Sequence, residues 1–216
     1  MILRRVFLSL MGRHAFHTPA VELHYHGMAT HSDPTDESLM LSYKDGDSRA
    51  FEQLYLRHKG GLYRYILRSC ESKATTEELF QDVWMRVINA RNNYQTTALF
   101  TTWLYRIASN RLTDHYRKHG KWDQYIDQHD ENDETCAIAT AYEQPEHQTD
   151  INQQIQRLLT CLEQLPALQR QVFLLKEEAG LKLEEIAKTI ESSKEAVKSR
   201  MRYAISRLRH CMQAES

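Results

Sequence analysis

Basic side chains recur on one face of the C-terminal segment 181–209, LKLEEIAKTIESSKEAVKSRMRYAISRLR. The segment predicts two helices joined by a three-residue turn. In the second helix, apolar residues recur every three or four positions and should face the core: Val197, Met201, Ile205 and Leu208. The opposite face is cationic. Such a unit can lay its second helix in the DNA major groove, where Arg or Lys to guanine is the commonest specific contact.

The residues of this face that can contact DNA are Ser193, Lys194, Lys198, Ser199, Arg200 and Arg202. Ser193 can cap the helix, and a helix N-terminus can itself bind a phosphate. Lys198 and Arg202 lie one turn apart, so both can enter one groove. The alternative is a solvated basic face on an ordinary helix bundle. The turn spacing and the packing position of Ala187 disfavour that alternative.

A second basic segment, residues 100–121, has the sequence FTTWLYRIASNRLTDHYRKHGK. Its cations alternate with aromatic residues: Arg106, Arg111, Arg117, Lys118 and Lys121 with Trp103, Tyr105 and Tyr116. Cations can follow a phosphate backbone while aromatic rings stack on unpaired bases. Trp103 lies at helical spacing from Phe100 and Ile107, so we expect it in the core. The arginines and Asn110 then form the exposed, functional side.

Helices must position both segments, because no alternating apolar pattern predicts a strand. A first helical block begins near Leu39. The next helix is predicted to begin at Thr75, with Glu78 completing a capping box. A polar loop at 89–97 precedes the helix of the second basic segment. Four further helices follow residue 151, with Pro166 in a first turn and Gly180 as a C-terminal stop. The chain is therefore predicted to be all-α.

The net charge of −1 conceals three blocks of opposite sign. Residues 38–121 hold 14 Lys and Arg against 8 Asp and Glu, residues 122–150 hold none against 9, and residues 151–216 hold 11 against 8. A block as polar as 122–150 cannot bury enough surface to offset its ordering entropy. We therefore predict two small helical domains, 38–121 and 151–212, joined by an acidic flexible linker at 122–150.

Several classes of protein are disfavoured. The four cysteines, Cys70, Cys136, Cys161 and Cys211, are far apart and form no CxxC pair, which argues against a disulfide scaffold or a zinc ribbon. Reduced thiols in a cytoplasmic protein are expected. No apolar run approaches the roughly 20 residues that span a membrane. No nucleophile–base pair or Gly-rich phosphate loop stands out, so neither an enzyme nor a cofactor or metal is expected.

The leader, residues 1–37, is predicted to be disordered. A short apolar run after two arginines faintly resembles a signal peptide but lacks a clear cleavage site. Five histidines follow: His14, His17, His24, His26 and His31. His24 and His26 could bind a metal, but they have no Cys partners. An alternative is an upstream stretch included by a wrong start, with Met28 or Met40 as the true start.

In combination, these motifs resemble a bacterial sigma factor of the extracytoplasmic-function group. Residues 46–55 (GDSRAFEQLY) resemble the opening helix of the family's domain two. Residues 78–84 (ELFQDVW) resemble the helix that grips the coiled coil of the polymerase β′ subunit. Residues 103–110 (WLYRIASN) resemble the segment that opens and reads the −10 promoter element. Residues 165–173, 184–187 and 197–200 (LPALQRQVF, EEIA and VKSR) resemble domain four, which reads the −35 element.

The resemblance implies roles for particular residues. Core polymerase would be contacted by Glu78, Gln81, Asp82 and Trp84. The −10 element would be bound by Tyr94, Thr96, Thr97, Arg106, Asn110, Arg117 and Lys118, with a flipped base held by the loop at 94–98. The −35 duplex would be bound by the basic face of the last helix. The implied partners are core RNA polymerase, through its β′ coiled coil and β flap, promoter DNA and an anti-sigma factor. The acidic linker would run toward the RNA path.

The chain departs from the family pattern at four places. The flipped-base loop carries Gln95-Thr96-Thr97 instead of a basic-Gly pattern. Glu191 replaces a common turn glycine, which costs about 1 kcal/mol if a left-handed conformation is required. Lys182 replaces a capping Ser or Thr, and Tyr203 stands where some members have Arg. Each departure bears on which promoter is read.

The expected function is thus a dissociable initiation factor that directs promoter recognition and promoter melting. One alternative is a conventional helix-turn-helix regulator that binds duplex DNA without polymerase. A second alternative is an interaction protein that occupies polymerase without initiating. The first alternative does not require the 78–84 motif, and transcription assays distinguish the second.

Overall fold

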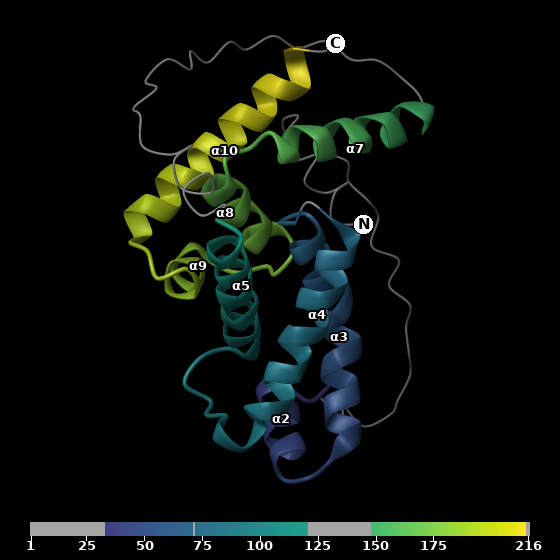
Figure 1. Cartoon of the computed structure of the whole chain (residues 1–216), viewed down its shortest axis with the longest axis vertical. Helices are drawn as coiled ribbons and strands as arrows, with labels where there is room; N and C mark the ends of the chain where they lie inside the picture. Colours follow the sequence, from purple (N-terminus) through teal and green to yellow (C-terminus); the bar gives the residue numbers. More distant parts are fainter. Residues whose placement is uncertain (1–32, 71, 121–147, 215–216) are drawn as a thin grey trace, which may run out of the picture.

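The computed structural model describes residues 33–70, 72–120 and 148–214, and these are helical with no strand. The elements in chain order are α2 (Asp36–Lys44), α3 (Ser48–Leu67), α4 (Lys73–Asn89), the 3-10 turn η1 (Arg91–Asn93), α5 (Phe100–Lys118), α7 (Gln148–Glu163), α8 (Ala167–Glu177), α9 (Leu183–Thr189) and α10 (Lys194–Ala214) (Figure 1). The all-α prediction is confirmed. Within the described residues no helix is long and apolar enough to cross a membrane.

The helix boundaries follow from capping residues. The first helical block is two helices, because Gly46 adopts a φ of 109° and Asp47 then caps α3. The side chain of Ser72 accepts a hydrogen bond from the Thr75 amide at 3.1 Å, so α4 begins earlier than predicted, and Ser72 rather than Thr75 is its cap. Near the other end of the chain, Gly180 has a φ of 67° just after α8, as expected of a C-terminal stop.

The predicted boundaries of the leader and the linker are shifted. The leader lies outside the described residues up to residue 32, but Asp36 and Glu37 belong to the folded unit. The Glu37 carboxylate accepts a hydrogen bond from the Phe100 amide at 2.7 Å and so caps α5 from a distant part of the chain. The predicted linker also lies outside the described residues, except that α7 already begins at Gln148.

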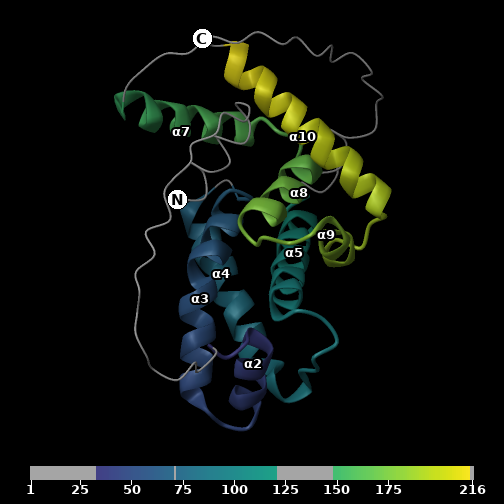
Figure 2. The ribbon, with the colours of Figure 1, turned by 180° about the vertical axis from the view of Figure 1, so that it is seen from behind.

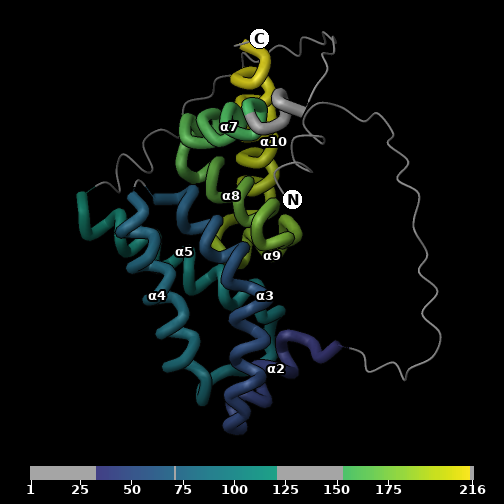
Figure 3. Tube along the Cα trace, turned by 90° about the vertical axis from the view of Figure 1, so that its right-hand side faces the viewer, coloured from purple at the N-terminus to yellow at the C-terminus, as the bar shows by residue number. Residues whose placement is uncertain are grey.

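The N-terminal unit, α2 to α5, packs around apolar residues at helical spacing. On α4 these are Leu79, Val83 and Val87, all buried as predicted. An aromatic cluster joins α3 to α4, formed by Phe51, Tyr55, Phe80 and Trp84. The C-terminal unit, α7 to α10, has a smaller core in which Leu158, Leu162, Phe173, Ala204, Leu208 and Met212 are buried. Figure 3 shows α7 lying across α10 at the top of the molecule.

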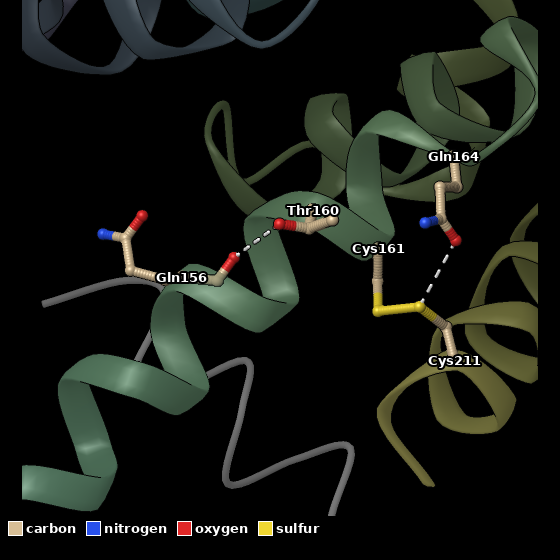
Figure 4. The surroundings of a disulfide bond; sticks show 5 residues. All are labelled: Gln156, Thr160, Cys161, Gln164 and Cys211. Atoms are coloured by element: carbon tan, nitrogen blue, oxygen red, sulfur yellow. Dashed lines mark hydrogen bonds between the residues drawn. A yellow bond between two sulfur atoms is a disulfide. The ribbon is translucent and has the colours of Figure 1, made fainter. Parts of the chain in front are cut away.

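A disulfide joins Cys161 of α7 to Cys211 of α10, which corrects the prediction of reduced thiols for this pair (Figure 4). Their Cα atoms are 5.9 Å apart although 50 residues separate them in sequence. The pairing arises because α7 crosses α10, which the cysteine spacing alone does not reveal. Closing a loop of this length stabilises a fold by about 4 kcal/mol in the chain-entropy account.

The two units are separate along the chain but share one core in space. Buried residues of the C-terminal unit, Ala167, Val172, Leu174, Leu175, Leu181, Ile186, Ala187 and Val197, belong to the same apolar cluster as α2 to α5. α9 lies beside α5, and α8 lies above α5, in opposite views (Figures 1 and 2). The helix that carries the second basic segment is therefore in contact with the C-terminal unit.

Candidate nucleic-acid interface

A pocket of about 420 Å³ lies between the C-terminal part of α4 and the middle of α5. It is lined by Arg86, Asn89, Ala90, Trp103, Ile107 and Asn110. Aromatic and amide groups around a concave surface can stack on and hydrogen-bond a flat polar ring. Of the residues predicted to bind the −10 element, Asn110 alone lines this pocket.

An aromatic cluster supports the pocket from behind. Trp103 is half-buried, and its ring lies 5.0 Å from Tyr94 and 5.8 Å from Phe100. Tyr94 is only 3% exposed. Burial, and then the charges of Glu37 and Asp36, raise the pKa of Tyr94 to about 12. Tyr94 therefore anchors the start of the loop from inside, and its contact with the −10 element stays a prediction.

The remaining predicted −10 residues are exposed. Thr96 and Thr97 lie in the loop before α5, and Arg117 and Lys118 lie in its last turn. Arg106 projects from α5, and its Nη2 lies 2.7 Å from Oε1 of Glu191. The structure thus places Arg106 in contact with the other unit, and places Arg117 and Lys118 at the end of the same helix.

Arg111 differs from the other cations of the segment. It is only 19% exposed and forms an ion pair with Asp82 of α4. Its Nη1 also lies 3.5 Å from Oδ2 of Asp114. Arg111 therefore joins α4 to α5 instead of facing solvent with its neighbours.

The predicted polymerase-binding residues divide into two groups. Glu78 and Gln81 are exposed on α4, and Asp82 is 44% exposed beside them. Trp84 is 5% exposed and packs against Phe51 and Tyr55. Trp84 consequently holds α4 against α3, and its contact with polymerase stays a prediction.

The turn between α9 and α10 is built by local hydrogen bonds. The Ser193 hydroxyl accepts from the Ala196 amide at 3.1 Å and so caps α10 as predicted. Glu191 adopts a φ of 52°, which is the left-handed conformation. This conformation was expected because Glu191 stands where the family commonly has a turn glycine. At the start of α9, the Glu185 carboxylate accepts from the Lys182 amide at 2.7 Å. That bond satisfies the Lys182 amide at the helix terminus, although Lys182 replaces the usual Ser or Thr.

The cations of α10 are not equivalent. Lys198 is exposed and Ser199 is half-buried. Nζ of Lys194 donates a hydrogen bond to Oε1 of Glu184 at 2.5 Å. This hydrogen bond raises the pKa of Lys194 and lowers that of Glu184. Arg200 donates to the Ser192 hydroxyl at 3.1 Å and so braces the turn. The exposed Arg202 guanidinium lies 5.0 Å above the ring of Tyr203.

Arg86 and Asn89 line the pocket from the α4 side and were not predicted as site residues. The prediction assigned Asn89 to a loop, whereas α4 continues through it. Arg86 and Asn89 lie three positions apart, and residues at that spacing share one helix face. The spacing indicates a common surface only when α4 is known to extend to Asn89.

Two matches with known families decide the identity. Residues 54–121 match Sigma-70 region 2, and residues 155–208 match Sigma-70, region 4. The chain belongs to the sigma-70 family. It is an RNA polymerase sigma factor of the extracytoplasmic-function (ECF) group. Its pocket lies between helices of the region 2 match, and α9 and α10 fall largely within the region 4 match.

Three relatives illustrate the family. The RNA polymerase sigma factor CarQ of Myxococcus xanthus is 29% identical over 67% of this chain and 79% of its own length. The ECF RNA polymerase sigma factor SigW of Bacillus subtilis is 32% identical over 39% of this chain and 44% of its own. The solved structure of RpoE in complex with the anti-sigma factor NepR from Bartonella quintana is 23% identical. It has a TM-score of 0.57 and covers 77% of this chain and 98% of that one, so it shares the fold of this sigma factor.

Proposed function

We propose that this sigma factor docks on core polymerase through α4, captures a −10 base in the pocket between α4 and α5, and reads the −35 duplex with α10. The observation that carries the proposal is the pocket, because Trp103 and Asn110 both line it, and the exposed Arg106 belongs to the same helix. The N-terminal unit would act as the polymerase and −10 domain and the C-terminal unit as the −35 domain.

Docking on polymerase would use the exposed side of α4. Glu78 and Gln81 are polar and exposed there, and Met85 is an apolar residue that is 52% exposed. This mixture suits an interface with a helical partner such as the β′ coiled coil. Asp82 would contribute less to this interface, because its carboxylate already forms an ion pair with Arg111. The C-terminal unit would meet the β flap.

Capture of a −10 base would proceed by binding alone. An unpaired base would enter the pocket and stack against Trp103, and Asn110 would form hydrogen bonds with its polar edge. Arg106, Arg117 and Lys118 would contact the phosphates, with Thr96 and Thr97 at the rim. Such contacts offset the few kcal/mol that unstacking a base costs. No catalytic group takes part in this account.

Recognition of the −35 duplex would use the exposed Lys198 and Arg202 for base edges or phosphates. The N-terminus of α10, with Ser193 and Lys194, would bind a phosphate. Arg200 would hold the turn through Ser192, since its guanidinium already has that partner. Ser199 would lie at the edge of this surface.

The proposal extends to a partner and a location. The structural relative RpoE is bound to an anti-sigma factor, and we infer that a protein of that kind also holds this chain. Because polymerase and the chromosome are cytoplasmic, the sigma factor would act in the cytoplasm.

Transcription with purified core polymerase tests the proposal. A pool of genomic fragments is transcribed with and without the purified chain, and the 5′ ends of the transcripts are sequenced. Discrete start sites that depend on the chain and share two upstream motifs are the expected result. The absence of any chain-dependent start site contradicts the proposal. Tight binding of the free chain to duplex DNA, without polymerase, would favour the conventional regulator.

A further inference from the structure

The loop at residues 95–99, at the rim of the proposed −10 site, does not hold its own shape. All of its residues are exposed, whereas its neighbours Tyr94 and Phe100 are buried. Within the described part of the chain, no hydrogen bond joins residues 95–98 to one another or to the rest of the protein. The loop also contains neither proline nor glycine. Its shape therefore depends on how its two ends are held.

Helix α2 provides a hydrogen bond to each end of this loop. Nζ of Lys44 donates to the carbonyl oxygen of Tyr94 at 3.3 Å, and the Glu37 carboxylate accepts from the Phe100 amide at 2.7 Å. Glu37 and Lys44 lie seven positions apart, or about two helical turns, so both side chains leave α2 on the same side. Figures 1 and 2 show α2 beside the turn that leads from α4 to α5. One helix thus fixes both ends of the loop.

The bond from Glu37 takes the place of a cap that α5 lacks. Leu99 occupies the N-cap position of α5, and its side chain forms no capping hydrogen bond. A carboxylate at a helix N-terminus also interacts favourably with the helix dipole. Because α5 begins at Phe100, Glu37 fixes the point at which the loop ends and the helix that carries Trp103 and Asn110 begins.

α2 is itself anchored to α3 at both of its ends. The Asp36 carboxylate accepts a hydrogen bond from Nη1 of Arg57 at 2.9 Å and lies 2.6 Å from Nε2 of His58. At the other end of α2, the ring of Tyr43 lies 4.8 Å from the ring of Phe51. These contacts hold α2 in one place, so α2 can fix the ends of the loop relative to the rest of the N-terminal unit.

We propose that α2 is the positioning element of the −10 loop, and that Glu37 and Lys44 act through this loop to set which base the site accepts. This inference rests on the proposed function, because it takes the loop to lie at the rim of the base pocket. Its new content is that two residues outside the DNA-binding surface determine base preference. Neither residue contacts DNA in this account.

Releasing one end of the loop is expected to reduce discrimination between bases more than it reduces binding. A released loop adopts several shapes, and each of them still presents the hydroxyl groups of Thr96 and Thr97 to a nucleic acid. Only the shape that α2 maintains matches the preferred base. The advantage of that base therefore falls with the fraction of molecules in which the loop has this shape.

The test measures base preference in the complete initiation complex. The complex is assembled from core polymerase and the full chain. The probes are fluorescein-labelled single strands of a promoter mapped by the transcription experiment, with each of the four bases placed in turn at each −10 position. The quantity compared is the ratio of affinities for the best and the worst base at the position where wild type discriminates most.

Glu37→Ala and Lys44→Ala are each expected to lower this ratio about fivefold, which is the size of effect that loss of one helix-cap hydrogen bond produces. Two matched controls remove exposed side chains of the same charge from other helices. They are Glu163→Ala on α7 and Lys176→Ala on α8, and both should keep the wild-type ratio. In folded variants, an unchanged ratio or an equal loss of affinity for all four bases overturns the proposal.

Conservative variants separate hydrogen bonding from charge. Glu37→Gln keeps an acceptor oxygen for the Phe100 amide, and Lys44→Arg keeps a donor for the Tyr94 carbonyl oxygen, so both should retain most of the wild-type ratio. A Glu37→Gln variant that discriminates as poorly as Glu37→Ala would assign the effect to charge and overturn the positioning role.

A double variant tests whether Glu37 acts through the loop. Thr96→Ala is expected to lower the ratio in the wild-type background and to have little further effect in Glu37→Ala, because the effects of coupled residues are not additive. Fully additive effects would overturn this route.

Urea unfolding, and anisotropy with core polymerase, establish that each variant is folded and docks. Lys44→Ala decides the question if Glu37→Ala fails to fold, because the Lys44 side chain is only half-buried. If wild type itself shows no base preference at any −10 position, the proposed function is wrong. If wild type discriminates and both alanine variants discriminate equally well, only the role of α2 is wrong.

Discussion

Asp82 of α4 and Arg111 of α5 form an ion pair that joins the proposed polymerase-binding helix to the proposed −10-reading helix. Arg111 is 19% exposed, and Asp82 is 44% exposed. The pair therefore ties the orientation of α5 to that of α4. It also changes how polymerase binding should be tested, because Asp82→Arg would set two arginines side by side and disturb both helices.

Gln81→Arg is the cleaner test of polymerase docking, because Gln81 is exposed and adjacent to this ion pair. A long charged side chain in the middle of an interface is expected to weaken binding at least about tenfold. Fluorescence anisotropy with core polymerase measures the affinity. Gln156→Arg, the same substitution on the exposed side of α7, serves as the control. Equal affinities of the two variants for core polymerase would show that the docking surface does not include Gln81 on α4.

Lys198→Ala is expected to weaken promoter binding by the polymerase-bound chain and to flatten its salt dependence. Each phosphate contact contributes about 1 to the slope of log affinity against log salt. The measurement is promoter affinity over a range of salt concentrations. Lys176→Ala, which removes an exposed cation from α8, should leave the slope unchanged. A slope identical to wild type for Lys198→Ala would exclude a phosphate contact at that residue.

Glu191 offers a test of backbone strain, because its φ is 52°. Glu191→Gly and Glu191→Ala both remove the carboxylate that pairs with Arg106, so they differ only in backbone preference. Glycine adopts the left-handed conformation without a Cβ penalty, and the Gly variant should be more stable than the Ala variant by about 1 kcal/mol. Urea unfolding of both variants measures the difference. An Ala variant of equal or greater stability would show that the turn does not need this conformation.

The disulfide between Cys161 and Cys211 should make the stability of the chain depend on reductant. Reduction is expected to lower the free energy of unfolding of the C-terminal unit by up to about 4 kcal/mol. Thermal unfolding with and without dithiothreitol measures the shift. The double variant Cys161→Ala and Cys211→Ala should show no shift, and Cys70→Ser should keep it. A wild-type chain insensitive to reductant would contradict the pairing.

The raised pKa of Tyr94 predicts an alkaline loss of stability. Its folded pKa of about 12 lies above the ordinary value of 10.0, so the folded state holds the proton more tightly than the unfolded chain. The resulting stability is fully present below pH 10 and falls as the pH rises toward 12. At about pH 11 the loss is on the order of 1 kcal/mol. Urea unfolding below pH 10 and at about pH 11 should show a smaller loss of unfolding free energy in Tyr94→Phe than in wild type. An identical loss would contradict a raised pKa at Tyr94.

Local periodicity predicted what depends on one helix at a time. Val197 and Leu208 are buried on α10, Lys198 and Arg202 are exposed, and Ser193 caps the helix. The left-handed turn at Glu191 was implied instead by the family resemblance, in which a glycine is common at this position. The burial and exposure pattern of α10 and its cap follow from the spacing of residues within about ten positions of one another.

Contacts between distant segments were not predictable in this way. The resemblance assigned Trp84 to polymerase and Tyr94 to the −10 element, but it did not reveal that aromatic residues from other helices bury each of them. Arg111 looked like an exposed cation, yet Asp82 lies opposite it. The contact of Glu178 with α3 depends on how two units pack, and no sequence spacing encodes it.

Footprinting of the promoter complex shows most directly whether two basic surfaces read a split site while the chain is docked on polymerase. Core polymerase with the chain should protect two separated DNA segments, and permanganate should detect unpaired thymines in the downstream segment. Polymerase alone should give neither signal. A single protected segment formed by the chain without polymerase, with no reactive thymine, would contradict the account.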